Sequence, residues 1–164
     1  MPRLPEPALE LRVTGYAHPD ATLLVDRVQG EYAERYGTPD ESPIDPVLFD
    51  APDGLFVVGY AAGVPVATGA WRVSPVRALG GRRAVEVKRM YVVPEARGRG
   101  LARVVLAELE STAVAAGHDL VVLETGTKQP EAIALYLSSG YVEVPGFGHY
   151  VGSPLSRCFG KRLA

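Results

Sequence analysis

The segment at residues 91–102, with the sequence YVVPEARGRGLA, constrains the fold more than any other part of the chain. An apolar, strand-like run ends at Pro94, and Gly98 and Gly100 precede a helical pattern of apolar residues. Glycine lets the backbone approach a ligand closely, and the first N–H groups of a helix have no partner within the helix. These groups also carry the positive end of the helix dipole. The segment therefore predicts an anion site, for which a pyrophosphate is a natural ligand.

Three basic residues, Arg97, Arg99 and Arg103, add positive charge around this turn. Two common nucleotide sites are excluded. The chain has no GxxxxGK[ST] motif, and the glycine spacing lacks the third glycine of the dinucleotide-binding fingerprint. On glycine and arginine alone, a flexible solvated turn remains an alternative to a pyrophosphate site.

The rest of the chain alternates between strand and helix patterns. Apolar periodicity and the positions of Gly and Pro set the expected boundaries. Strands are expected over 8–15, 55–60, 64–73, 84–93, 120–123, 141–144 and 156–163, and helices over 20–36, 98–116 and 131–139, with one short helix at 46–49 inside a loop.

Composition narrows the class of protein. The 164 residues fit a single domain spanning 1–164, and the one cysteine, Cys158, excludes an intramolecular disulfide and a four-cysteine zinc site. A net charge of −2 argues against a general nucleic-acid binder. Prolines interrupt the first residues where a signal peptide needs an apolar core, and no run is long enough to span a membrane. We therefore expect a cytoplasmic protein.

A second block, at residues 129–141, reads QPEAIALYLSSGY. Together the two blocks resemble the GNAT acetyltransferase superfamily. The first matches its coenzyme A signature [QR]-x-x-G-x-[GA] from Arg97 to Ala102. The second matches its N-x-x-A-x-x-L-Y-x-x-x-G-F helix, with Gln129 in place of Asn and Tyr141 in place of Phe. The resemblance is close over about 71–144 and weakest over 1–50.

The resemblance implies an α/β GNAT fold, with a mixed, mostly antiparallel sheet of six to seven strands, splayed central strands and about four helices. It also implies acetyl-CoA as co-substrate and no metal. The pyrophosphate is expected on backbone N–H groups of the glycine turn, and the pantetheine arm on the strand before it. The expected cofactor-binding residues are Met90, Tyr91, Val92, Arg97, Gly98, Arg99, Gly100, Leu101, Ala102, Gln129 and Tyr136.

Three residues are candidates for the chemistry, because amine acetylation needs a proton acceptor for the amine and a proton donor for the leaving thiolate. Glu86 is expected on the face of Met90 and falls where some protein-lysine acetylating members carry their base. Glu124 follows a buried strand and is the rival base. Tyr136 corresponds to the family tyrosine near the coenzyme sulfur. A salt-bridged strand glutamate and a core tyrosine are the structural alternatives for Glu86 and Tyr136.

The expected acceptor is a primary amine of a small molecule. Acidic residues between 35 and 53 and aromatic residues in the loop at 145–154 suit a closed pocket for a compact cation. The alternatives are acetylation of a protein lysine or N-terminus, or a non-enzymatic acyl-CoA sensor or interaction module. The sequence leaves the oligomeric state open between a monomer and a homodimer. The residues expected to wall the acceptor pocket are Asp40, Glu41, Asp45, Asp50, Phe147, His149 and Tyr150.

Overall fold

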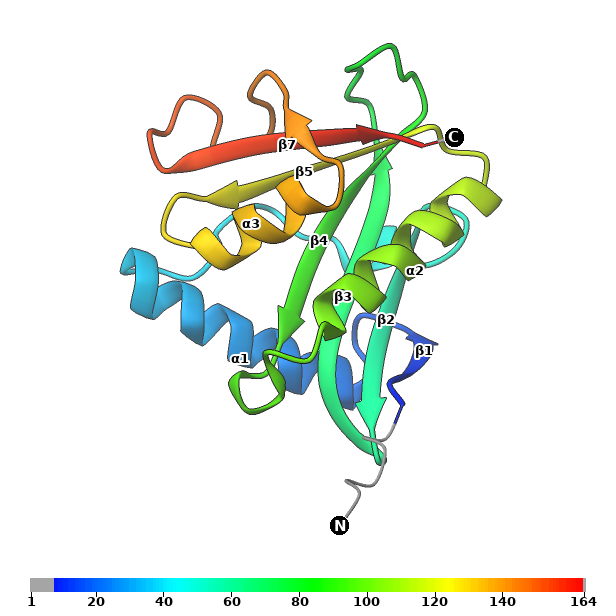
Figure 1. Cartoon of the computed structure of the whole chain (residues 1–164), viewed down its shortest axis with the longest axis vertical. Coiled ribbons are helices and arrows are strands. Elements are labelled where there is room, and N and C mark those ends of the chain that lie inside the picture. Colours follow the sequence, from blue (N-terminus) through cyan, green and yellow to red (C-terminus); the bar gives the residue numbers. More distant parts are fainter. Residues whose placement is uncertain (1–7, 164) are drawn as a thin grey trace.

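The computed structural model describes residues 8–163, which form one seven-stranded sheet with helices on both faces (Figure 1). The strand order is β1-β2-β3-β4-β5-β7-β6, and every neighbouring pair is antiparallel except β4 and β5. The strands are β1 Glu10–Thr14, β2 Gly54–Ala61, β3 Val64–Ser74, β4 Ala84–Val92, β5 Leu120–Gly126, β6 Val142–Glu143 and β7 Ser156–Arg162.

Three α-helices and two 3-10 turns complete the described chain. The mixed, mostly antiparallel sheet is confirmed. About four helices were expected. Three of them are α-helices, and the fourth, the short helix at 46–49, is a 3-10 turn. The helices are α1 Pro19–Tyr36, α2 Leu101–Ala115 and α3 Pro130–Ser138, and the 3-10 turns are η1 Pro46–Phe49 and η2 Pro94–Ala96.

Local chemistry explains where the early elements begin and end. The side chain of His18 caps α1 by accepting a hydrogen bond from the Asp20 N–H at 3.1 Å. The helix ends at Gly37, which has a left-handed conformation with φ 82°. Between β2 and β3, Ala62 and Gly63 both have positive φ, as a two-residue hairpin turn requires.

Helix α2 begins at Leu101, three residues later than the pattern predicted. Gly98 and Gly100 have φ values of 80° and 75°, so neither glycine is helical. The glycine turn therefore stands ahead of α2 and leaves its first N–H groups directed out of the helix.

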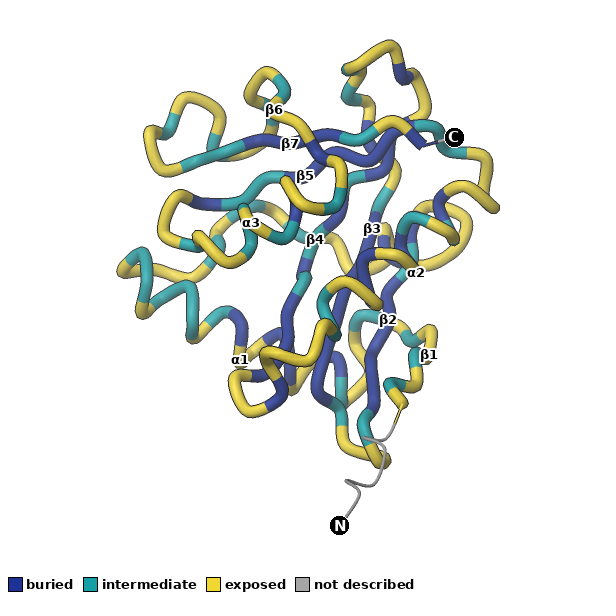
Figure 2. The backbone as a smooth tube through the Cα atoms, viewed as in Figure 1, coloured by how far each residue is buried: buried dark blue, intermediate teal, exposed yellow. Residues whose placement is uncertain are grey.

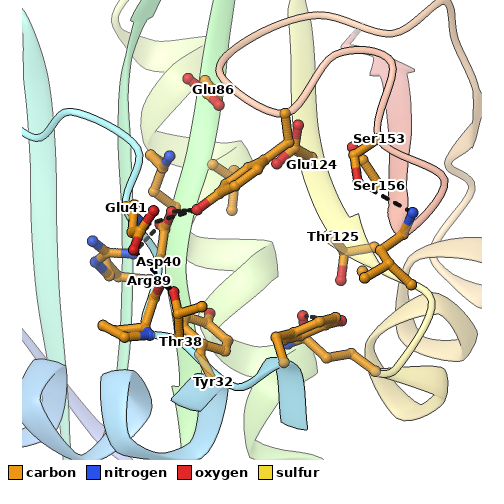
Figure 3. Close-up of a pocket in the computed structure, with 18 residues that line it drawn as sticks. Tyr32, Thr38, Asp40, Glu41, Glu86, Arg89, Glu124, Thr125, Ser153 and Ser156 are labelled. Atoms are coloured by element: carbon orange, nitrogen blue, oxygen red, sulfur yellow. Dashed lines mark hydrogen bonds and ion pairs between the residues drawn. The ribbon is translucent and has the colours of Figure 1, made fainter.

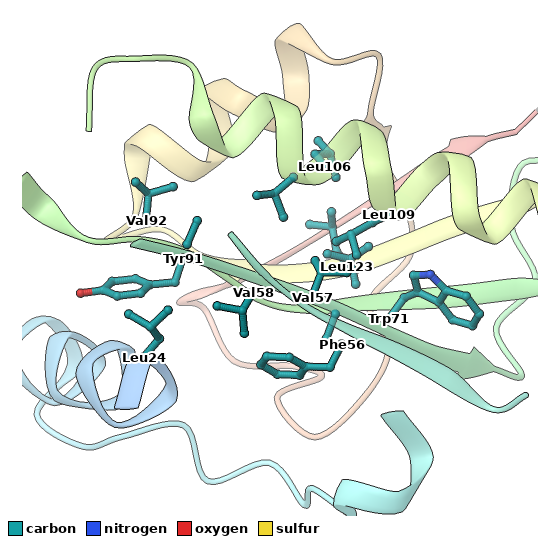
Figure 4. Packing of buried hydrophobic residues seen from close by; sticks show 14 of the residues in the cluster. Leu24, Phe56, Val57, Val58, Trp71, Tyr91, Val92, Leu106, Leu109 and Leu123 are labelled. Atoms are coloured by element: carbon teal, nitrogen blue, oxygen red, sulfur yellow. The ribbon is translucent and has the colours of Figure 1, made fainter. Parts of the chain in front are cut away.

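The helices sandwich the sheet, with α1 on one face and α2 on the other (Figure 4). Helix α3 lies beside α2. The two are joined by hydrogen bonds from the Arg103 guanidinium of α2 to the hydroxyls of Ser138 and Ser139 at the end of α3. The central strands are buried along most of their length, whereas the connecting loops are exposed (Figure 2). Residues 120–123 of β5 are at most 1% exposed, which confirms a strand buried on both faces.

The parallel pair β4 and β5 separates soon after it forms. The two strands pair only between Ala84–Glu86 and Leu120–Val122, and beyond this point they diverge (Figure 1). The expected splay of the central strands is therefore confirmed, and it opens a gap at the centre of the sheet.

Candidate active site

A groove of about 660 Å³ lies at the end of β4, where the glycine turn and the first turn of α2 face α3. All but one of the residues expected to bind the cofactor line this groove. The sequence-predicted residues that line it are Met90, Tyr91, Val92, Arg97, Gly98, Gly100, Leu101, Ala102, Gln129 and Tyr136. Arg99 is exposed and does not line it.

The wall of this groove at α2 is suited to an anion. Gly100 occupies the N-cap without any side-chain cap, and the first turn of α2 has no acidic residue. A Cβ built at Gly98 or Gly100 would meet nothing within 4 Å, so the turn opens onto free space. Uncapped N–H groups, the positive end of a helix dipole and room for a ligand together form a site for phosphate oxygens.

Arg97 is engaged by the protein itself. Its Nε donates to the Val92 carbonyl at 2.9 Å, and its Nη2 donates to the Glu31 carboxylate of α1 at 2.9 Å. The side chain thus ties the glycine turn to α1 and to the end of β4. It also occupies one backbone carbonyl of β4, the strand on which the resemblance places the pantetheine arm. The β5-facing edge of β4 remains unpaired with β5 beyond Glu86, which leaves room for an added extended chain.

Tyr136 of α3 lines the groove and is only 5% exposed. Its ring packs edge-on against that of Tyr141, with the centroids 5.6 Å apart. Burial raises the pKa of Tyr136 well above the usual value for a phenol, so its hydroxyl stays protonated at neutral pH. A protonated hydroxyl in this position can donate a hydrogen bond to a ligand in the groove.

A second cavity, of about 290 Å³, fills the gap between β4 and β5 (Figure 3). The labelled side chains converge on it from different elements. Glu86 comes from β4, Glu124 from β5, and Ser156 from β7. Gln129 lines both this cavity and the groove, so it borders both spaces. We call this space the gap cavity. Tyr32 and Tyr36 of α1 also line it.

The face assigned to Glu86 from the sequence is wrong. A Cβ built at Gly69 would lie 3.0 Å from the Met90 sulfur and even closer to Val105 of α2, so Met90 is on the α2 face. Glu86 instead lines the gap cavity and bonds to Arg72 on the opposite face. A β-bulge at Arg89, which has φ 57°, reverses the alternation between them.

The two candidate bases differ in their partners. Glu86 Oε1 accepts two hydrogen bonds from Arg72, at 3.2 and 3.1 Å. Glu124 has no salt-bridge partner within residues 8–163. Burial raises the pKa of Glu124, which makes its carboxylate a stronger base than an exposed one.

The acidic residues expected around the acceptor divide into two groups. Asp40 and Glu41 line the gap cavity, but Asp45 and Asp50 do not. Asp45 instead caps η1 by accepting a hydrogen bond from the Val47 N–H. Asp40 is also not free to hold an amine, because its Oδ2 accepts a 2.8 Å bond from the Arg89 guanidinium.

The loop at 145–154 contributes through Tyr150. Its hydroxyl donates to Asp40 Oδ1 at 2.9 Å and accepts a bond from the Glu41 N–H at 2.8 Å. These bonds tie the loop to the segment after α1 and close one side of the gap cavity. Phe147 and His149 do not line the cavity, and His149 is exposed, so two of the three aromatic positions expected there are wrong.

Sequence reasoning missed two cations in the gap cavity. Lys88 and Arg89 are consecutive in β4, and both line it. Two adjacent cations inside β4 were the available signal, because a buried strand rarely carries cations without a partner or a ligand. Ser153 and Ser156 also line the cavity, but serines before a strand carry no such signal.

Within the described range 8–163, no group of three or more His, Cys, Asp and Glu side chains is arranged to hold a metal ion. Over the same range, no helix has the length and apolar character needed to cross a membrane.

Comparison with known proteins agrees with this geometry. Residues 24–141 match the model of the acetyltransferase (GNAT) family. An IAA acetyltransferase from Azospirillum brasilense is 34% identical over 140 residues, covering 85% of this chain and 88% of its own length.

Solved structures share the whole architecture. A protein described as an acyl-CoA N-acyltransferase from Klebsiella pneumoniae superimposes with a TM-score of 0.77 at 27% identity, covering 95% of this chain and 98% of its own. The PaiA N-acetyltransferase from Thermoplasma acidophilum, solved in complex with coenzyme A, gives a TM-score of 0.68 at 15% identity, covering 94% and 99%. The chain therefore belongs to the GNAT acetyltransferase family and is an N-acetyltransferase.

Proposed function

We propose that the protein transfers an acetyl group from acetyl-CoA directly to a primary amine of a small molecule. The observation that carries this proposal is a pair of neighbouring cavities that both border Gln129. One cavity has an anion cradle and a buried tyrosine, and the other has a half-buried carboxylate.

The groove is the proposed donor site. The N–H groups at the start of α2 would hold the pyrophosphate, and the free edge of β4 would hold the extended pantetheine arm. The PaiA structure contains coenzyme A on the same fold, which supports this assignment. A thioester entering along β4 would approach Gln129, which borders both cavities.

The gap cavity supplies the base. An alkyl ammonium must lose a proton before its nitrogen can attack. Glu124 is the proposed acceptor because its carboxylate is half-buried and forms no salt bridge within residues 8–163. Glu86 remains the alternative base in the same cavity, but Arg72 occupies one of its oxygens. The nitrogen then forms a bond to the thioester carbonyl carbon, and the carbon–sulfur bond breaks.

Tyr136 is the proposed acid for the departing sulfur, since its hydroxyl is protonated and lies in the donor groove. The nitrogen loses two protons over the whole reaction. One leaves through Glu124 to solvent. Tyr136 gives its own proton to the thiolate, and the second proton from the nitrogen restores the Tyr136 hydroxyl. The products are an amide and free coenzyme A, and no acetyl-enzyme is required.

The size and closure of the gap cavity favour a small acceptor. Its volume of about 290 Å³ lies at the low end for small-molecule sites, which run from about 300 to 1,000 Å³. Tyr150 closes one side through its bonds to Asp40 and Glu41, whereas an extended peptide needs an open groove. The Azospirillum relative is likewise named for acetylating IAA. We also propose a cytoplasmic setting, which fits the single buried Cys158.

Release of thiol from acetyl-CoA in the presence of an amine panel tests the proposal. The panel holds free amino acids, polyamines and aminoglycosides beside lysine peptides. Small amines should release thiol well above the rate of hydrolysis. Turnover of the peptides alone would assign the protein to protein acetylation, and release of thiol with none of the small amines would contradict the proposal.

A further inference from the structure

The gap cavity is lined by six charged side chains of both signs, and three of them are in ion pairs. Arg89 bonds to Asp40 at 2.8 Å, and Arg72 bonds to Glu86 at 3.1 Å. These two pairs leave one half-buried cation, Lys88, without an anion in contact.

Lys88 has only a neutral hydrogen-bond partner within residues 8–163. Its Nζ lies 3.1 Å from Ser42 Oγ, and that hydroxyl in turn donates to Asp40 Oδ1 at 2.7 Å. Burial lowers the pKa of Lys88, because removing an ammonium from water disfavours its charge. A cation in this position is stabilised when a ligand brings an anion into contact with it.

Lys88 and Glu124 occupy matching places on the two diverging strands. The last paired residues are Glu86 and Val122, and Lys88 and Glu124 each follow two residues later. Side chains two residues apart on a strand share a face. Lys88 therefore lies on the same face as Glu86, and Glu124 on the same face as Val122, at the edge of the gap. Both line the gap cavity, one with a positive and one with a negative charge.

We infer that the acceptor is an amino carboxylate, an amino acid in the broad sense, whose amine lies toward Glu124 and whose carboxylate pairs with Lys88. This inference rests on the proposed function and names the substrate class of the same site. A cavity of about 290 Å³ has room for one such molecule. The free carboxylate would supply the anion that Lys88 lacks, and the ammonium would supply the cation that Glu124 lacks.

Matched acceptors test this inference on the full chain. Each amino acid that releases thiol is compared with its own carboxamide and with its decarboxylated amine, which keep the amine and remove the negative charge. The free acid should have the lower KM by about 10- to 100-fold, the range expected for one charge-assisted hydrogen bond. This comparison uses the unaltered protein and so does not depend on any variant folding.

The variant Lys88→Met tests whether Lys88 causes the preference for the free acid over its carboxamide. It should reduce the ratio of kcat/KM between acid and carboxamide by the same factor, through KM of the acid rather than kcat. Arg82→Met removes an equal charge from an exposed residue outside both cavities and should leave the ratio unchanged. A thermal shift with acetyl-CoA checks that each variant retains its donor site.

Two results overturn the inference. If carboxamides or decarboxylated amines are acetylated as well as the acids, or if Lys88→Met keeps the preference, Lys88 does not read a carboxylate, and the proposed small-amine activity stands. If no small amine of any kind releases thiol, the proposed function itself fails, and the inference fails with it.

Discussion

Lys88 and Glu124 stand on opposite sides of the gap between β4 and β5, each two residues beyond the last pair that joins these strands. The sheet itself places them there, because pairing up to Glu86 and Val122 holds both strands before they separate. The proposed reaction centre is thus built on two strands of the sheet, and the loop that Tyr150 ties to Asp40 closes its side.

The roles of the two carboxylates can be separated by pH. Because a base must be ionised, kcat/KM should rise with pH through the pKa of the essential carboxylate. Burial raises the pKa of Glu124 above its ordinary value of 4.5. Glu124→Gln should remove this acidic limb and lower kcat by about 10²- to 10⁴-fold. Glu86→Gln is the matched control and should keep the limb. The reverse pattern would transfer the role of base to Glu86.

Tyr136→Phe tests the proton donor. The loss of the hydroxyl should lower kcat by about 10²- to 10⁴-fold, because the thiolate then leaves without a positioned acid. The Kd for acetyl-CoA, measured by calorimetry, should barely change. Tyr141→Phe removes the same atom from the neighbouring ring, where it bonds to Glu110 outside the groove, and should retain activity. Equal losses in both variants would point to packing rather than proton transfer.

Gly100→Asp tests the pyrophosphate cradle. Acetyl-CoA should raise the Tm of the wild type as its concentration exceeds Kd, since only the folded state binds it. The introduced carboxylate would oppose the phosphates and abolish this gain. Gly63→Asp is a close control, because Gly63 also has positive φ, at 78° against 75°, and open space around its Cβ, but lies in the β2–β3 turn. A persistent shift in Gly100→Asp would exclude this cradle as the donor site.

The buried pair of Asp40 and Arg89 should make stability depend on pH. Burial acts to raise the pKa of Asp40, but hydrogen bonds from Ser42 and Arg89 outweigh it and hold the pKa well below the ordinary 3.8. The stabilisation is therefore present above about pH 4 and is lost as pH falls below it. Asp40→Ala should lower the free energy of unfolding by about 3 kcal/mol at pH 7.

Chemical denaturation at pH 7 and pH 3 measures this effect. The difference between wild type and Asp40→Ala should shrink at the lower pH. Asp26→Ala, at an exposed position of α1, should stay near wild type at both. A difference independent of pH would show that Asp40 stabilises by packing alone.

Much of this fold could be predicted from local sequence. Gly37 ends α1 where the periodicity stops, and the apolar run at 120–123 is the buried strand β5. The donor groove was also predictable, because its residues form two contiguous motifs. In such cases the signal and the structure that it predicts lie within the same few residues.

The acceptor side could not be predicted in the same way. The bulge at Arg89 places a non-glycine residue at positive φ, a conformation that costs about 1–3 kcal/mol and persists only with support from its surroundings. That support comes from Tyr16 and Asp40, which bond to its guanidinium from 73 and 49 residues away. No local pattern reveals such contacts, so the face of Glu86 could not be predicted.

Transfer of a labelled acetyl group tests the central claim most directly. The protein is incubated with acetyl-CoA carrying an isotope in its acetyl group and with a small amine that releases thiol, and the mixture is analysed by mass spectrometry. The account predicts that the label appears as an amide on the small molecule and that the protein remains unlabelled. Label found only on lysines or N-termini of added peptides, or retained on the enzyme as an obligatory intermediate, would contradict it.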